Sequence, residues 1–164
     1  MRKTYILAVV FGLLLLAPLD SAARSSGIEK NKAVARQLFE VALNQDNWEV
    51  YNQIHTPDFI AHAGKRSETL AEDLQSAKGW RGAFPDGQYS VDKVIAEGDF
   101  VVVYFTGRGT NTGSGNGLPP TGKKIELTAT TIFRIVHGKI AEEWTEYDRM
   151  SLMKQLGLVP PVAH

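Results

Sequence analysis

The chain has 164 residues, with 18 Lys and Arg against 18 Asp and Glu, so its formal net charge at pH 7 is zero. This even balance argues against a nucleic-acid-binding protein, whose domain is expected to be basic. The chain has no cysteine, which excludes both a disulfide framework and a lipid anchor on cysteine. Stability therefore has to come from a hydrophobic core.

The first 23 residues have the pattern of a secretory signal. Arg2 and Lys3 precede an apolar run from Tyr5 to Ala17, and the small residues Ser21 and Ala23 follow as a cleavage site. The run is shorter than the roughly 20 apolar residues of a membrane-spanning helix. We expect cleavage near Ala23, export to the periplasm or the medium, and no stable membrane anchor after processing; a retained anchor is the alternative. Residues 24–164 then suit a single domain.

Three helices are predicted before the sheet. In the first, from Glu29 to Asn44, apolar residues recur at helical spacing. A second, short helix runs from Asn47 to Ile54, and a proline at position 57 closes it. Residues 69–72 form a capping-box pattern, which starts a third helix that reaches about Phe84 and ends in a Pro-Asp-Gly turn.

Strand patterns fill the second half of the chain. Gln88–Ala96 and Phe100–Gly109 flank a short turn, which predicts antiparallel pairing. A further hairpin turns at His137-Gly138 and continues to Tyr147. Helices followed by antiparallel strands, without strand-helix-strand alternation, indicate an α+β fold.

The loop between the two hairpins, residues 111–122, is flexible by composition and contains a near match to a nucleotide-binding motif. Gly117 to Lys124, GLPPTGKK, lacks the hydroxyl that would hold magnesium, and its two prolines remove backbone donors from a phosphate cradle. The following residues continue as a strand, where a helix is required. The motif is therefore interpreted as a coincidence.

Asp148 marks the change from a strand pattern to a helix pattern. In a strand of period two, residues 140, 142, 144, 146 and 148 share one face, unless a bulge exchanges the faces. Trp144 and Asp148 are expected to lie close together. Helical spacing then continues to Gly157. Without further information, Asp148 is explained equally well as a helix N-cap.

Several side chains are candidates for lining a ligand pocket. His62 follows an alternating run and could point into a pocket, although a structural histidine is the alternative; no recognisable metal-binding set is present. No nucleophile motif for covalent acyl chemistry is found. A pool of aromatic residues suits an apolar ligand, but core packing explains any one of them equally well: Trp80, Phe84, Tyr104, Trp144 and Tyr147.

The run GKIAEEWTEYDRMSLMKQLG resembles the C-terminal signature of the SnoaL-like polyketide cyclase family in the NTF2-like superfamily. NKAVARQLFE, TPDFIAH and AFPDGQYSV resemble earlier parts of the same family. The resemblance implies a cone, in which a curved antiparallel sheet wraps the N-terminal helices around a central pocket. It also implies that Asp148 is the acid/base of an aldol ring closure on a small apolar carbonyl compound, without metal or organic cofactor.

The resemblance further implies polar residues on the strands beside the acid, and Arg134 and Glu146 hold these positions here. It implies a homodimer through the outer sheet face, for which the mixed face of residues 141, 143, 145 and 147 is suitable. Three functions stay open: an acid/base enzyme, an exported binding protein for an apolar ligand, and a structural association domain whose cone is filled by its own side chains. An open apolar pocket touched by Asp148 would favour the first two.

Overall fold

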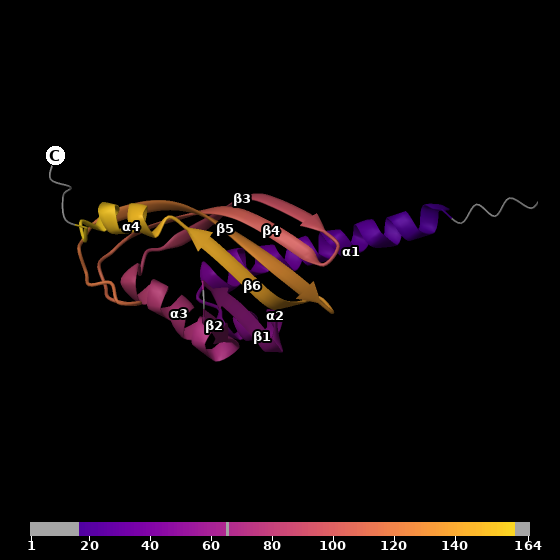
Figure 1. The fold of residues 1–164 in the computed structure, drawn as a ribbon, viewed down its shortest axis with the longest axis horizontal. Helices are drawn as coiled ribbons and strands as arrows, with labels where there is room; N and C mark the ends of the chain where they lie inside the picture. Colours follow the sequence, from indigo (N-terminus) through magenta and orange to yellow (C-terminus); the bar gives the residue numbers. More distant parts are fainter. Residues whose placement is uncertain (1–16, 65, 160–164) are drawn as a thin grey trace, which may run out of the picture.

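The computed structural model describes residues 17–64 and 66–159. Most of the predicted export signal, residues 1–16, lies outside the described residues. Along the chain, helices are interspersed with the strands of one curved sheet (Figure 1). The elements are α1 (Ala17–Gln37), η1 (Leu38–Leu43), α2 (Trp48–Ile54), β1 (His55–Ala63), β2 (Arg66–Thr69), α3 (Leu70–Ala83), β3 (Gln88–Glu97), β4 (Phe100–Thr110), β5 (Lys124–Val136), β6 (Lys139–Tyr147) and α4 (Arg149–Leu156).

The first predicted helix is present but starts earlier and ends differently. It begins at Ala17, and its last six residues, η1, form a π-helix. The wider turn is visible in the hydrogen bond from Asn44 N to Phe39 O, 3.0 Å long, which spans five residues. Leu38 and Phe39 are consecutive and both buried. The π-helix therefore directs two neighbouring large side chains toward the inside of the fold.

Side chains cap the starts of both α2 and α3, and the cap of α3 is the predicted one. Asn47 caps α2 by accepting a hydrogen bond from Val50 N. Thr69 and Glu72 form the predicted capping box at the start of α3. The expectation that three helices precede the sheet is wrong, because β1 and β2 lie between α2 and α3. The strand β1 begins at His55, directly after the last residue of α2.

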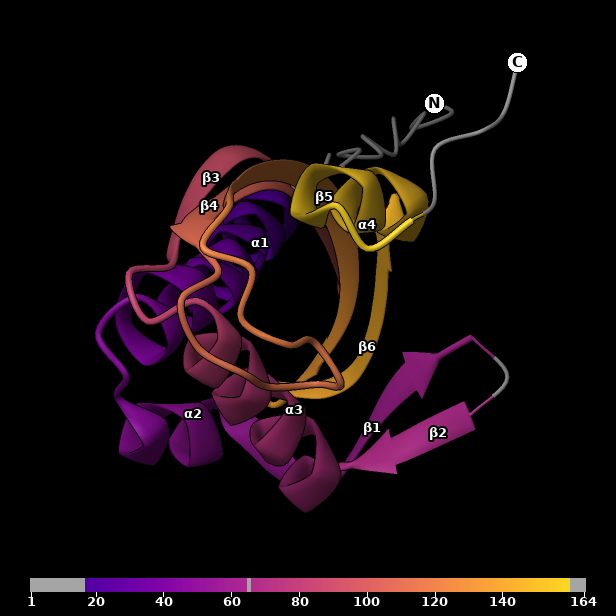
Figure 2. The same cartoon turned by 90° about the vertical axis from the view of Figure 1, so that its left-hand side faces the viewer.

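The six strands form one sheet in the order β2-β1-β6-β5-β4-β3. Neighbouring strands are antiparallel except β1 and β6, which are parallel, so the predicted all-antiparallel sheet needs this correction. Figure 2 shows the strands curving around α1, with α3 across from them and the β1–β2 hairpin at the side. The architecture is the predicted α+β cone.

A bulge in β6 decides which side chains face the inside of the cone. Arg134 pairs with Glu142, whereas the next residue of β5, Ile135, pairs with Ile140, so that Ala141 is an extra residue. Beyond the bulge the alternation is shifted by one. Glu143 lies opposite Phe133, whose side chain is fully buried. The predicted assignment is therefore reversed: residues 143, 145 and 147 point inward, and residues 142, 144 and 146 point outward.

Two apolar clusters hold the fold together. The larger one packs η1 against the inner face of the sheet, where the rings of Phe39 and Phe105 are tilted by 45° with their centroids 4.6 Å apart. The smaller one joins the end of α3, the loop before β5 and α4, and it contains Phe84 and Leu118. In residues 17–64 and 66–159, no helix has both the length and the apolar character needed to cross a membrane.

The loop at residues 111–122 is tied down rather than free, contrary to the expectation from its composition. Asn111 is fully buried, and its amide nitrogen donates to Ala83 O and Gly113 O, each at 3.1 Å. Its amide oxygen accepts from the backbone and the hydroxyl of Thr121. One asparagine thus satisfies polar groups on both sides of the loop and fixes it against α3.

Candidate functional site

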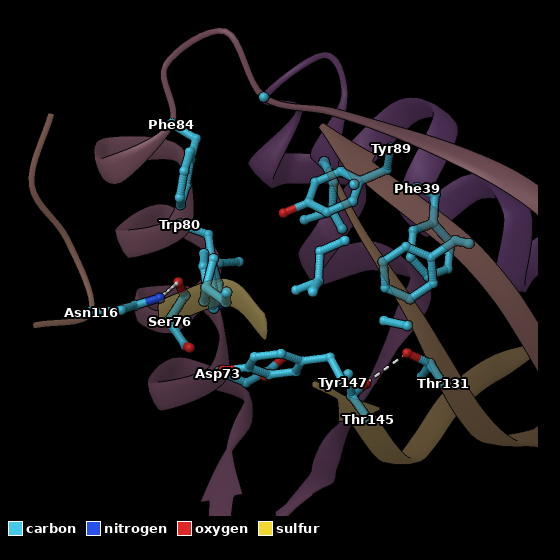
Figure 3. Close-up of a pocket in the computed structure, with 18 of the residues that line it drawn as sticks. Phe39, Asp73, Ser76, Trp80, Phe84, Tyr89, Asn116, Thr131, Thr145 and Tyr147 are labelled. Atoms are coloured by element: carbon cyan, nitrogen blue, oxygen red, sulfur yellow. Dashed lines mark hydrogen bonds between the residues drawn. The ribbon is translucent and has the colours of Figure 1, made fainter. Parts of the chain in front are cut away.

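The inside of the cone holds a cavity of about 530 Å³, which is within the range of small-molecule sites. Figure 3 shows Trp80 and Phe84 of α3 on one side and Phe39 and Tyr89 on the other. The remaining apolar wall comes from η1, α3, α4, the sheet and the loop before β5: Leu38, Leu43, Ala61, Ala77, Phe105, Leu118, Ile125, Leu127, Ala129, Leu152 and Met153. An apolar ligand is the natural occupant of such a wall.

A chain of hydroxyl groups ends at a carboxyl group on the cavity wall. Thr145 donates from Oγ1 to Glu143 Oε1 at 2.8 Å, so the hydroxyl of Thr131, 2.6 Å from Thr145 Oγ1, has to be the donor between the two threonines (Figure 3). Glu143, Thr145 and Thr131 all line the cavity. These bonds fix one oxygen of Glu143 and leave Oε2 without a hydrogen bond from the described residues.

A second carboxyl group, that of Asp73 on α3, lies beside Glu143. The hydroxyl of Tyr51 donates to Asp73 Oδ2. Burial raises the pKa of Tyr51 far above its ordinary value, and the acidic neighbours add to the effect, so this residue stays a neutral phenol and a donor. Asp73 and Tyr51 both line the cavity, so its polar end joins α2, α3 and β6.

Burial raises the pKa of both carboxyl groups, and the charge of Glu68 raises each of them further. Burial, followed by the charge of Asp73, raises the pKa of Glu143 from 4.5 to about 8, whereas the hydrogen bond from Thr145 works in the opposite direction. Burial also raises the pKa of Asp73, against the hydrogen bond from Tyr51. Two adjacent carboxylates in an apolar surround repel each other, so a proton at this end of the cavity is favoured at neutral pH.

His55 lies beside the carboxyl groups of Asp73 and Glu143. Its Nδ1 lies 2.6 Å from the backbone oxygen of Tyr51, and burial lowers the pKa of the ring to about 4, so the ring is neutral at neutral pH. One ligand atom from each of His55, Asp73 and Glu143 lies within 4.8 Å of the other two. Of the described residues, these three are the ones whose side chains are grouped closely enough to hold a metal ion.

Four of the predicted pocket residues lie at the cavity. Trp80 and Phe84 face it from α3, with their rings stacked 5.9 Å apart. Tyr147, from the predicted aromatic pool, also lines it and meets Trp80 edge-on at 6.0 Å. His62 contributes to the lining, but its ring stacks on Trp144 at 4.5 Å and its Nε2 lies 2.9 Å from Glu142 Oε2.

The other strand candidates lie outside the cavity lining. Trp144, Arg134 and Tyr104 are on the outer face of the sheet, where Arg134 donates from Nε to Glu142 Oε1 at 2.6 Å and the Tyr104 ring is covered by the ammonium of Lys93. Glu146 is exposed opposite Thr130. The Ala141 bulge explains the placement of Trp144 and Glu146, because both follow it on β6.

Asp148 is the N-cap of α4. Its Oδ1 accepts a hydrogen bond from Ser151 N at 2.8 Å, and the residue is exposed. Its chain neighbours Tyr147 and Arg149 line the cavity, whereas Asp148 is not one of the lining residues. The capping role that the sequence allowed is therefore present, and α4 ends as predicted at Gly157 in the left-handed conformation (φ 70°).

Sequence reasoning missed the polar end of the cavity. Glu143 was placed on the outer face, and no local signal revealed the bulge that turns it inward. Asp73 lies in the first turn of α3, where acidic residues are expected for helix stability alone. His55 follows α2 directly, and the sequence around it contains no recognisable metal-binding set. Only the pairing of β1 with β6 brings these residues together.

Comparison with known proteins places the chain in a family. A model described as SnoaL-like polyketide cyclase matches residues 33–156. The solved structure of AclR from Streptomyces galilaeus, a candidate hydroxylase, is 26% identical with a TM-score of 0.74, over 81% of this chain and 99% of that one. A candidate SnoaL-like polyketide cyclase from Jannaschia sp. CCS1 is 25% identical with a TM-score of 0.75, over 81% and 95%.

A third similar structure is IdmH from Streptomyces antibioticus, a candidate polyketide cyclase, 28% identical with a TM-score of 0.68 over 77% of this chain and 98% of that one. None of the curated proteins matches the chain. The family match and the cone with its cavity support a small-molecule cyclase or isomerase type of protein. The chain belongs to the SnoaL-like polyketide cyclase family, within the NTF2-like superfamily.

Proposed function

We propose that the protein is an acid/base enzyme that cyclises or isomerises a small, mostly apolar carbonyl compound inside the cone. The observation that carries the proposal is the position of Glu143: its carboxyl group lies at the polar end of an otherwise largely apolar cavity, held by Thr145 through one oxygen. A carboxyl group in this setting can exchange a proton with a bound molecule without competition from bulk water.

The proposed reaction is balanced in protons. In its ionised form, Glu143 takes a proton from the carbon next to a carbonyl group. The resulting enolate carbon attacks a second carbonyl of the same molecule, and the new alkoxide oxygen takes the proton back from Glu143. For an isomerisation, the proton returns to a different carbon. Thr145 holds Glu143 in place, the neighbouring half-buried Asp73 raises its pKa, and the reaction uses no oxidant or reductant.

The ligand class follows from the lining of the cavity. Paired aromatic rings on α3 face the rings of η1 and β3, which suits a flat, apolar or aromatic molecule. Arg66, Arg108 and Arg149 are part of the lining and come from β2, β4 and α4; Arg66 is paired with Glu68 and Arg108 with Glu126. We infer a compound with an apolar body and carbonyl groups that reach the polar end.

Asp148 is the alternative acid/base, which the family resemblance implies. It lies between two lining residues, and the hydrogen bond from Ser151 occupies only one of its oxygens. Its exposure argues for Glu143, because an exposed carboxylate keeps its hydration and is a weak base for a carbon acid. The two assignments predict opposite results for the variants below.

A binding protein without turnover is the second candidate function. The cavity volume favours both this candidate and the enzyme over a structural association domain, whose cone would be filled by its own side chains. The predicted secretory signal fits an exported binding protein as well as an exported enzyme. Intact-mass measurement of the protein from its native host tests export: a mature chain that begins at Arg24 supports it, and a chain that retains Met1 contradicts it.

The experiment begins with a ligand screen by native mass spectrometry, followed by turnover measurements on the compounds that bind. We expect Glu143→Gln to lower kcat by roughly a hundredfold or more, the usual contribution of a general acid/base. Glu142→Gln is the matched control: the neighbouring residue points outward and its variant should turn over as the wild type does. A loss in Asp148→Asn with full activity in Glu143→Gln would transfer the role to Asp148. Binding without turnover in the wild type would favour the binding protein.

A further inference from the structure

A buried histidine with a free ring nitrogen lies beside the carboxyl groups at the polar end of the cavity, although it is not itself a lining residue. His55 is 1% exposed. The backbone oxygen of Tyr51 can only accept a hydrogen bond, so Nδ1, 2.6 Å away, carries the proton of the neutral ring. The other nitrogen, Nε2, is therefore an unprotonated lone pair, and within the described residues it has no hydrogen-bond partner. A buried acceptor without a partner is unfavourable and requires an explanation.

Two carboxyl groups lie next to this histidine, each with one oxygen already held. Tyr51 donates to Asp73 Oδ2, and Thr145 donates to Glu143 Oε1. Asp73 Oδ1 and Glu143 Oε2 accept no hydrogen bond from the described residues. One ligand atom from each of His55, Asp73 and Glu143 lies within 4.8 Å of the other two. The three groups thus form a triangle of electron-pair donors.

We propose that His55, Asp73 and Glu143 bind one divalent first-row transition-metal cation, with Zn²⁺ as the representative, through His55 Nε2 and one oxygen of each carboxylate. One imidazole and two carboxylates are a suitable set for Zn²⁺, Mn²⁺ or Fe²⁺, whereas Mg²⁺ and Ca²⁺ prefer oxygen ligands alone. The cation would neutralise two carboxylates that are otherwise forced together. Its remaining positions would face the cavity, because Asp73 and Glu143 line it.

The supporting hydrogen bonds are those that metal sites use. A ligating histidine usually donates its other ring N–H to a backbone carbonyl or a carboxylate, which fixes the ring, and His55 does so to Tyr51. Ligating carboxylates are themselves hydrogen-bonded, as Asp73 and Glu143 are. All three ligands sit on regular elements, the first residue of β1, the first turn of α3 and the middle of β6.

The distances are close to those that binding requires. Tetrahedral Zn²⁺ with ligands at about 2.1 Å places ligand atoms roughly 3.4 Å apart. Ligand atoms at the 4.8 Å limit would each have to move toward the cation by on the order of 0.7 Å, which side-chain rotation can supply. Glu68 and Arg66 line the cavity nearby as an ion pair and add no net charge.

This site goes beyond the proposed function, and the two are mutually exclusive at Glu143. An oxygen bound to a cation cannot carry the shuttled proton, so the cation-loaded form should not transfer protons through Glu143. The binding experiment does not depend on turnover. If the protein binds no cation, the acid/base proposal still stands. If Glu143→Gln leaves turnover unchanged, the proposed cation site still stands.

The test is a titration of the full untagged chain, freed of metal with EDTA and dialysed, with Zn²⁺ in a calorimeter and with Co²⁺ by visible absorption. We expect one cation per chain with a dissociation constant in the micromolar range or below. Glu143→Gln and Asp73→Asn should each weaken binding by tenfold or more, because each removes a charged ligand. Glu142→Gln changes the outward-pointing carboxylate of the adjacent residue on the same strand, and this variant should bind the cation as the wild type does.

Other outcomes overturn the proposal. The proposal is overturned if Zn²⁺ does not bind at millimolar concentration. It is also overturned if Zn²⁺ binds equally well to both ligand variants, because the cation would then be bound by another histidine, such as His137 or His62. Circular dichroism shows whether each variant is folded. If Asp73→Asn does not fold, Glu143→Gln alone decides, because an uncharged glutamine keeps the hydrogen bond from Thr145 and removes a buried charge.

Discussion

Glu143→Gln should make the metal-free protein less sensitive to alkaline pH. The wild-type carboxyl group has a pKa of about 8 in the folded protein, against 4.5 as its ordinary value, with burial as the largest cause. Between these values the folded state binds more protons than the unfolded state. The free energy of unfolding therefore decreases as the pH rises through this window. Glutamine cannot ionise, so residue 143 causes no such decrease in the free energy of unfolding of the variant.

The size of the effect follows from the pKa difference. One pKa unit corresponds to about 1.36 kcal/mol, so the full rise gives an upper limit of roughly 5 kcal/mol. Between pH 5 and pH 8 linkage allows about 3.5 kcal/mol of this limit, and part is shared with Asp73, which titrates as a pair with Glu143. We therefore expect the variant to gain about 2–3 kcal/mol relative to the wild type over this range. For a chain of this length, this corresponds to a Tm difference of roughly 5–15 °C.

The assay is thermal unfolding followed by circular dichroism at pH 5, 6, 7 and 8, with EDTA present throughout. Glu142→Gln serves as the control, because Glu142 is hydrogen-bonded to His62 and Arg134, and these bonds lower its pKa. The Glu142→Gln variant should therefore be less stable than the wild type at pH 5, and this loss should persist at higher pH. Parallel Tm curves for the wild type and Glu143→Gln from pH 5 to pH 8 would refute the reasoning that Glu143 titrates in a buried site.

Three further predictions concern the rest of the fold. Asn111→Ala should cost about 2–3 kcal/mol in urea unfolding, because buried donors and acceptors lose their partners, while the exposed Asn116→Ala should cost less than about 1 kcal/mol; equal costs would contradict the anchoring role. Asp148→Ala should cost about 1 kcal/mol and Asp148→Asn almost nothing, as for an N-cap; an equal loss in both would point to a role for the charge. Light scattering should show a homodimer through the outer sheet face, where Phe100 and Ile132 are 47% and 38% exposed, and Ile132→Lys should give monomers; a monomeric wild type at high concentration would refute this assembly.

Much of the fold could be predicted from local patterns. The capping box at Thr69 and Glu72, the cap at Asn47 and the glycine end at Gly157 each rest on the chemistry of a few neighbouring residues, and the structure contains all three. The strands from Gln88 onward also follow their alternation. The parallel pairing of β1 with β6 could not be predicted, because residues that far apart in the chain leave no local trace of their contact.

The candidate site was harder to predict from the sequence than the fold, and one residue explains why. Ala141 is the extra residue of a bulge, and its sequence does not distinguish it from a regular strand residue. Since the side-chain period of a strand is two, this single insertion moved Glu143 to the inside and Trp144 to the outside. The aromatic residues Trp80 and Phe84, which lie on a regular helix, were placed at the cavity as expected.

The most direct measurement of the central claim is proton exchange on carbon, because it needs no complete turnover. A ligand from the screen with a C–H between or beside carbonyl groups is incubated in D₂O with the metal-free protein, and NMR follows the loss of its proton signal. Wild type, Glu142→Gln and Asp148→Asn should accelerate the exchange to similar rates, whereas Glu143→Gln should be slower by roughly a hundredfold. Exchange that is unchanged in Glu143→Gln would contradict the assignment of Glu143 as the proton carrier of this cavity.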